Sequence, residues 1–100
     1  MVMIREIFFC KPGQVRPMVD KFKAMNAVME KTGLGRSKIM TDLSAERYWT
    51  VVSEWEVQSL GAFEEMMKST AMQNKEFENI MKDYHTHVES GRREIYTIEA

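Results

Sequence analysis

Residues 47–69 read RYWTVVSEWEVQSLGAFEEMMKS, a strand pattern that continues directly into a helix pattern. The first half is rich in β-branched and aromatic residues, which pack well on a pleated sheet. Since strand side chains alternate, Trp49 and Trp55 share one face, while Tyr48 and Val52 share the other. Neither face is cleanly polar, so we expect helices of this chain to cover one face and a second subunit to cover the other.

The chain before this stretch shows the same kinds of pattern. Residues 2–10 form a predicted strand with apolar side chains on both faces. An amphipathic helix is expected from about Gln14 to Gly33, where glycine supplies a left-handed end. Residues 37–43 predict a further strand, joined by a short turn at residues 44–46 to the strand that starts at Arg47.

The chain after it supplies the second half of the fold. Ser59 is placed to cap a helix, and residues 59–86 predict two short helices or one kinked helix with a break near residues 69–70. Gly91 is expected to end this region, and residues 92–99 predict the last strand.

The element order is therefore β-α-β-β-α-β, which is the order of an α+β, ferredoxin-like fold. We expect residues 1–100 to form a single domain with a four-stranded antiparallel sheet and helices on one face. The opposite face, here called the open face, would expose an apolar patch of a size that monomers rarely tolerate. A homodimer formed through the open face is the predicted assembly.

Composition excludes several function classes. With 14 basic and 15 acidic residues, the net charge of −1 argues against nucleic-acid and anionic-membrane partners, which require clustered positive charge. Cys10 is the only cysteine, so no intrachain disulfide is possible. No apolar run approaches the roughly 20 residues that span a bilayer. We therefore expect a cytoplasmic protein.

Three segments carry a resemblance to a known superfamily. KPG at residues 11–13, SEWEVQSLGAFEEMMKS at residues 53–69 and RREIYTIE at residues 92–99 resemble the dimeric α+β barrel superfamily. The similarity is to small bacterial NIPSNAP-like and antibiotic-biosynthesis-monooxygenase-like proteins, and it covers nearly the whole chain. The resemblance implies the fold and a homodimer, but no single reaction, because this fold hosts monooxygenases, haem-degrading enzymes, decarboxylases, isomerases and members without known activity.

Haem degradation is not predicted within this resemblance. The haem-degrading members are similar in having an Asn on the first strand and a Trp and a His in the second helical region. The matching positions here hold Glu6, Met66 and Glu76. We therefore carry over none of these roles and expect no cofactor.

Glu6 is the first candidate catalytic residue. It lies between Ile4 and Phe8 on the strand face that the helices should cover. Burial there would raise the pKa of the carboxyl group and produce a general acid or base that works near neutral pH. The alternative is that Glu6 forms an ion pair with a Lys or Arg.

His85 is the second candidate, as an acid or base at a pocket mouth. It forms an H-x-H pair with His87, but that spacing points the two rings to different sides of a helix, and no carboxylate or cysteine cluster completes a ligand set. No metal site is predicted. The alternative role is a favourable interaction with the end of a helix.

Aromatic residues are the candidates for substrate binding, namely Phe8, Trp49, Trp55 and Tyr84. The alternative is that they belong to the core or the dimer interface. The ten methionines fit either core filling or an adaptable pocket, and Cys10 is expected to be a small buried apolar residue.

Two functions follow from these observations. The first is binding of a small hydrophobic or aromatic molecule between sheet and helices, with a cofactor-independent monooxygenase-like reaction as its catalytic form. It requires a cavity of roughly a few hundred Å³ whose wall includes one of the polar candidates. The second is a non-catalytic dimeric binding or structural module in which the same aromatic residues are packed solid.

Overall fold

The structure, a computed structural model, describes residues 1–69 and 75–100. The chain forms β1 (Val2–Cys10), α1 (Val15–Lys31), β2 (Lys38–Thr41), β3 (Thr50–Val57), α2 (Leu60–Lys68), α3 (Lys75–Met81), the 3₁₀ helix η1 (Tyr84–Thr86) and β4 (Val88–Thr97).

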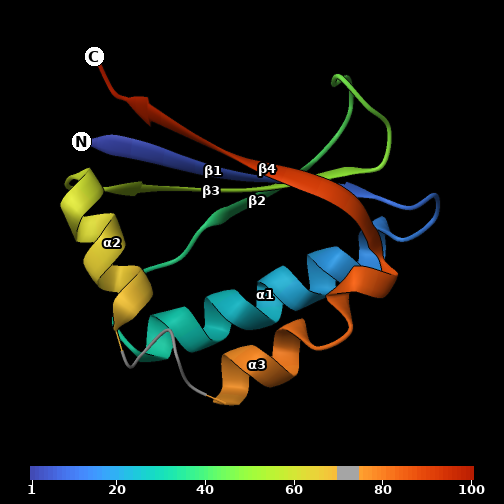
Figure 1. Cartoon of the computed structure of the whole chain (residues 1–100), viewed down its shortest axis with the longest axis horizontal. Helices are drawn as coiled ribbons and strands as arrows, with labels where there is room; N and C mark the ends of the chain where they lie inside the picture. The colour runs from blue at the N-terminus through green and yellow to red at the C-terminus, as the bar shows by residue number, and fades with distance from the viewer. Residues whose placement is uncertain (70–74) are drawn as a thin grey trace.

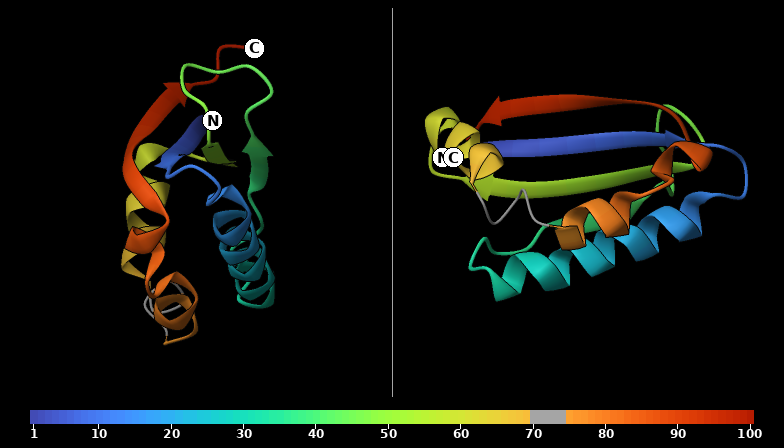
Figure 2. Two further views of the ribbon diagram at one scale, coloured as in Figure 1. Left: turned by 90° about the vertical axis from the view of Figure 1, so that its right-hand side faces the viewer. Right: turned by 60° about the horizontal axis from the view of Figure 1, so that its bottom comes forward.

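The strands form one antiparallel sheet in the order β2-β3-β1-β4, with β1 and β3 at its centre. All the helices lie on one side of this sheet, α1 beneath one part and α2 and α3 beneath another (Figures 1 and 2). This arrangement confirms the predicted α+β, ferredoxin-like fold. Both chain ends lie at the same end of the sheet (Figure 1), where the Ile98 amide donates a 3.1 Å hydrogen bond to the Met1 carbonyl.

The predicted first helix is confirmed at both ends. It begins after Gln14 and is followed by Gly33, whose φ of +77° is the left-handed conformation that glycine adopts without steric cost. The Leu34 amide donates to the Met29 carbonyl at 2.9 Å, which closes the helix end. Its core-facing side contributes the buried residues Met18, Val19, Phe22, Val28 and Met29.

The second helical region contains two short α-helices, α2 and α3, which confirms the first of the two predicted alternatives. Ser59 caps α2, because its Oγ accepts a 3.1 Å hydrogen bond from the Ala62 amide. The helix ends at Lys68 with Ser69 as the next residue, so the predicted break is confirmed at Ser69, and Thr70 lies outside the described residues. No helix in the described part of the chain is long and apolar enough to cross a membrane.

The third strand starts later than predicted, at Thr50 rather than Arg47. Trp49 has a φ of +63°, a left-handed conformation that interrupts an extended strand. The Asp42 side chain accepts a 2.9 Å hydrogen bond from the Thr50 amide and thereby fixes the strand start. Residues 42–49 therefore form a longer connection than the predicted three-residue turn.

Gly91 was predicted to end the helical region. It lies instead inside β4, which begins at Val88. It stands opposite Phe8 in the pairing of β1 with β4. A Cβ atom at Gly91 would lie 2.8 Å from the Ile7 carbonyl oxygen. The glycine is therefore required by close backbone approach rather than by a turn.

The open face is less apolar at its centre than predicted. Arg5 forms a 2.8 Å ion pair with Glu54 on β3, and its guanidinium lies 3.7 Å from Glu94 on β4. These charges occupy adjacent positions on three neighbouring strands, and Arg92 Nε lies 3.0 Å from Glu94, so two guanidinium groups balance two carboxylates on this face.

The apolar part of the open face lies beside the 42–49 connection. Ile7 and Phe9 are only 7% and 8% exposed there. The Arg47 guanidinium lies 4.4 Å from the centre of the Phe9 ring, within the range of a cation–π contact. This connection thus covers part of the apolar surface that was expected to need a second subunit.

Gly91→Ala should destabilise the protein, because the new methyl group clashes with the Ile7 carbonyl. We expect a loss of about 1–3 kcal/mol in the free energy of unfolding, measured by urea denaturation. Gly61→Ala is the matched control, since its Cβ would meet only Ser59 Oγ at 3.8 Å and alanine favours the helix. Equal effects of the two substitutions would show that the close approach at Gly91 carries no energetic weight.

Candidate functional site

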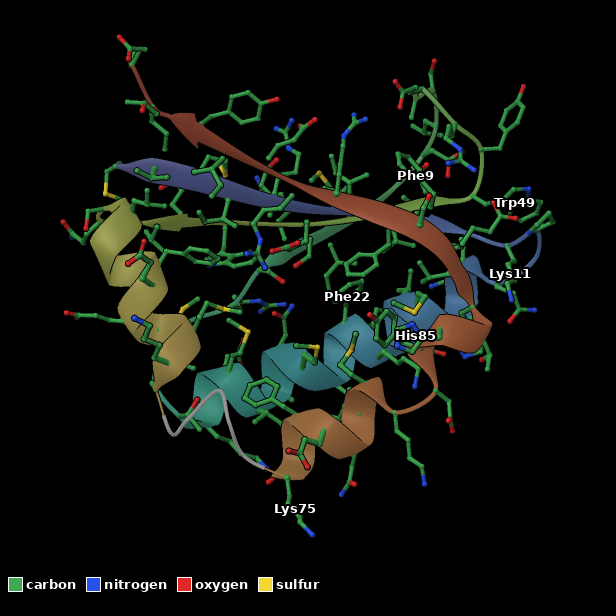
Figure 3. All side chains as sticks on the ribbon, in the orientation of Figure 1. Phe9, Lys11, Phe22, Trp49, Lys75 and His85 are labelled. Carbon is green, nitrogen blue, oxygen red and sulfur yellow. The ribbon has the colours of Figure 1, made fainter. Side chains whose placement is uncertain are left out.

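A cavity of about 190 Å³ lies between the helix side of the sheet and the three α-helices, and we term it the inner cavity. Phe8 and Trp55 reach it from the sheet, and Phe22 points toward it from α1 (Figure 3). The Phe8 and Phe22 ring centres are 5.2 Å apart. Two of the predicted substrate-binding residues, Phe8 and Trp55, are therefore brought together in one wall.

Methionine side chains form most of the helical wall of the inner cavity. Thioether chains are unbranched and polarisable, so such a wall adapts its shape at low energetic cost. The methionines that line it are Met25, Met29, Met66, Met67 and Met81.

Glu6 and Arg93 form an ion pair at the cavity wall. They are directly paired across β1 and β4, and Arg93 Nε donates a hydrogen bond to Glu6 Oε1. The Glu6 side chain is 19% exposed and that of Arg93 is 45% exposed. The alternative prediction for Glu6, a pairing with Lys or Arg, is confirmed.

Trp55 is half-buried in the same wall, with its ring centre 6.1 Å from that of Phe63. Its indole Nε1 atom is buried and has no hydrogen-bond partner within the described part of the chain. An unpaired buried donor of this kind costs roughly 1–3 kcal/mol.

A second hollow, the outer depression, has a volume of about 360 Å³ and lies between η1 and β4. Glu6 and His85 both line it, so the two predicted catalytic residues share one hollow. The Tyr84 ring stacks on the His85 ring at 4.0 Å and meets Phe8 edge-on at 6.3 Å. Because Glu6, Phe8 and Arg93 line both the inner cavity and the outer depression, they form the wall between them.

The two histidines have separate environments. His85 is exposed on η1 (Figure 3), whereas His87 Nδ1 lies 2.8 Å from Gln14 Oε1 near the start of α1. No group of three or more His, Cys, Asp or Glu residues capable of holding a metal ion occurs in residues 1–69 and 75–100.

Trp49 is placed away from the other aromatic candidates. It is 43% exposed at the far end of the sheet, beside Tyr48 and Val15 (Figure 3). Regular alternation of strand side chains would put Trp49 on the same sheet face as Trp55. The left-handed backbone at Trp49 interrupts that alternation. The structure therefore gives Trp49 no contact with the inner cavity.

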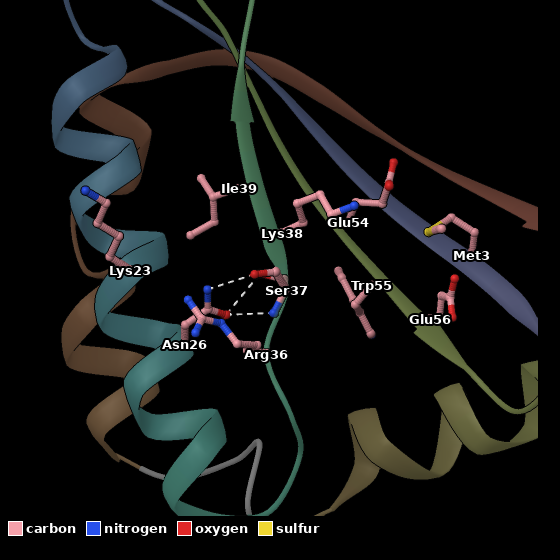
Figure 4. A pocket seen from close by; sticks show the side chains of 10 residues that line it. All are labelled: Met3, Lys23, Asn26, Arg36, Ser37, Lys38, Ile39, Glu54, Trp55 and Glu56. Carbon is pink, nitrogen blue, oxygen red and sulfur yellow. Dashed lines mark hydrogen bonds between the residues drawn. The ribbon is translucent and has the colours of Figure 1, made fainter.

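A larger groove of about 780 Å³ opens at the edge of the sheet where β2 begins (Figure 4). Asn26 forms its floor by donating to the Ser37 carbonyl at 3.0 Å and accepting from the Ser37 amide at 2.8 Å. Its rim carries exposed charges from Lys23, Arg36 and Glu56. We place the candidate site in the smaller inner cavity, because enclosure and an apolar wall are what bury a ligand.

Cys10 is buried at 3% exposure, as predicted for a small apolar residue. Burial raises the pKa of its thiol, and the negative charge of Asp42 raises it further. A thiol of this kind is a poor nucleophile near neutral pH.

Sequence reasoning missed Arg93 and the methionine wall. The alternation of side chains in the last strand puts Arg93 on the same face as Ile95, and this could be read from the sequence. The pairing of Arg93 with Glu6 could not, because it depends on the register between β1 and β4. Helical spacing identified several methionines as inward-facing without distinguishing packed positions from cavity positions.

The comparisons with known proteins agree with this fold. No family model matches the chain, and no curated protein is significantly similar in sequence. A NIPSNAP domain protein from Burkholderia xenovorans superposes with a TM-score of 0.80 at 10% identity, covering 100% of this chain and 96% of that chain. A NIPSNAP family protein from Agrobacterium tumefaciens gives 0.78 at 12% identity, covering 96% and 90%.

A putative antibiotic biosynthesis monooxygenase from Nitrosomonas europaea also superposes, with a TM-score of 0.70 at 11% identity and complete coverage of both chains. The resemblance to NIPSNAP-like and monooxygenase-like proteins is thus confirmed at the level of the fold. At these identities the similarity carries no information about the reaction.

Proposed function

We propose that this protein binds a small aromatic or otherwise apolar molecule in the inner cavity. The observation that carries this proposal is a partly enclosed space of about 190 Å³ beside a polar pair and a wall of flexible methionines. An engineered apolar protein cavity of about 150 Å³ accepts benzene. The inner cavity therefore has room for a single ring with a small substituent.

A cofactor-independent monooxygenase-like reaction is the catalytic form of this proposal. It is supported by Glu6, which lines both the inner cavity and the outer depression where His85 lies. In such a reaction, Glu6 accepts a proton from an activated CH₂ group of the substrate, and the resulting carbanion transfers electrons to O₂. The CH₂ group becomes a carbonyl group, and the second oxygen atom leaves as water, with His85 of the outer depression as the proposed proton donor.

The non-catalytic binding module is supported by the ion pair itself. Arg93 Nε already donates a hydrogen bond to Glu6 Oε1, so Arg93 competes with a substrate for that oxygen atom. Binding therefore stands as the primary proposal, and catalysis depends on whether Arg93 moves away from Glu6 when a substrate is bound.

We also propose a homodimer formed through the open face. Val52 lies at the centre of that face, opposite Ile7 on β1 and Met40 on β2. This apolar row, flanked by self-neutralising charges at Arg5 and Glu54, is a surface that a second copy would cover without burying an unpaired charge.

Toluene should bind the purified protein and raise its Tm in a concentration-dependent manner, measured by differential scanning fluorimetry. Ser53→Leu should abolish this shift, because the larger side chain projects into the inner cavity that Ser53 lines. Thr97→Leu also replaces a hydroxyl residue by leucine, at an exposed β4 position outside the cavity, and should leave binding intact. A wild-type protein that shows no toluene-dependent shift contradicts the binding proposal.

Oxygen uptake should accompany turnover of a single-ring carbon acid that is un-ionised at neutral pH, such as phenylacetone, measured with an oxygen electrode. Glu6→Gln should reduce the rate by at least about a hundredfold, because it removes the base and keeps the side-chain shape. Glu46→Gln is the control, since Glu46 also pairs with an arginine, at 3.3 Å from Arg92, but lies outside the site. Turnover that survives Glu6→Gln would falsify the general-base role.

Sedimentation equilibrium should give a particle of twice the 11.7 kDa chain mass. Val52→Lys should shift it to the monomer, because it places a charge in the middle of the apolar row. Leu60→Lys adds the same charge at a 50% exposed position at the start of α2 and should not change the mass. A wild-type monomer at micromolar concentration rules out this interface.

A further inference from the structure

Three of the polar residues that line the inner cavity form one row across the sheet. Arg93, Glu6 and Ser53 are direct neighbours on β4, β1 and β3, and all three line the cavity. The row on one side contains Gly91, Phe8 and Val51, and the row on the other contains Ile95, Ile4 and Trp55. A bound molecule therefore meets the charged pair along one narrow line of the sheet wall, while Ser37 and the Trp55 indole N–H add polar atoms outside that line.

The opposite wall of the cavity is formed by the helices and offers mainly thioethers and the Phe22 ring. Sulfur atoms make favourable contacts with the edges of aromatic rings, which saturated rings of the same size do not receive. The cavity thus favours a molecule with an aromatic body toward the helices and a single polar end toward the sheet.

The charge of the polar row limits what that end can be. Glu6 and Arg93 neutralise each other, so the row presents both an acceptor and a donor without net charge. A ligand carboxylate would approach the Glu6 carboxylate, and a ligand ammonium would approach the Arg93 guanidinium, each at an electrostatic cost. A hydroxyl group donates to one partner and accepts from the other.

We propose that the inner cavity is a site for an uncharged single-ring phenol, whose hydroxyl group bonds to the Glu6–Arg93 pair while its ring lies against the methionine wall. This inference rests on the proposed binding function and adds the chemical class of the ligand. It also gives Arg93 a role as a residue that determines specificity.

The test compares three molecules that share a methylated ring, namely toluene, 4-methylphenol and 4-methylbenzoate, by isothermal titration calorimetry. The wild-type protein should bind 4-methylphenol roughly tenfold more tightly than toluene, and 4-methylbenzoate more weakly than either. Glu6→Gln should remove most of the advantage of 4-methylphenol and leave toluene binding unchanged, because a charge-assisted hydrogen bond is lost. Glu46→Gln should change neither affinity, since its carboxylate lies outside the cavity.

A second measurement uses the wild-type protein alone. The ¹⁵N-edited NMR signal of Arg93 Nε–H should shift when 4-methylphenol is added but not when toluene is added, because only the phenol reaches the ion pair. Equal affinities for toluene and 4-methylphenol, or tighter binding of 4-methylbenzoate, overturn the phenol assignment and leave the binding proposal standing. Absence of binding by all three molecules overturns both.

Discussion

The antiparallel pairing of β1 with β3 is the constraint on which the rest of the structure depends. Eight consecutive pairs, from Val2 with Val57 to Phe9 with Thr50, fix which side chains face the helices. Since a shift by one residue would turn every side chain to the other face, this register decides that Glu6 and Ser53 meet the helical side together. The inner cavity, its polar row and the charge pairs of the open face all follow from that alignment.

The alternation of strand side chains between the two sheet faces predicted part of the site. Glu6 and Phe8 were assigned to the helix-facing side of the first strand, Trp55 was predicted to line a ligand pocket, and the structure places all three in the cavity wall. Trp49 departs from the alternation because its left-handed backbone is set by local contacts of the 42–49 connection. Such a conformation leaves no reliable mark in composition, and neither does the β1–β4 register that joins Arg93 to Glu6.

Gly91 shows a related limit of sequence interpretation. A glycine near the end of a helical region was taken to end it, whereas here it permits close backbone approach within a strand. Both uses depend on the missing Cβ atom, and only the neighbouring strand distinguishes them. The open face was likewise expected to be more apolar, because Arg5, Glu54 and Glu94 lie far apart in the sequence and their charge pairing appears only in the assembled sheet.

The inner cavity gives this small domain a distinctive response to hydrostatic pressure. Empty space inside a folded chain is lost when the chain unfolds, so the unfolded state occupies less volume, by an amount on the order of tens of mL/mol. The part of the 190 Å³ inner cavity that excludes water should therefore make this 100-residue protein easier to unfold by compression. An occupant of that void would remove part of the volume difference and make the native chain more resistant to pressure.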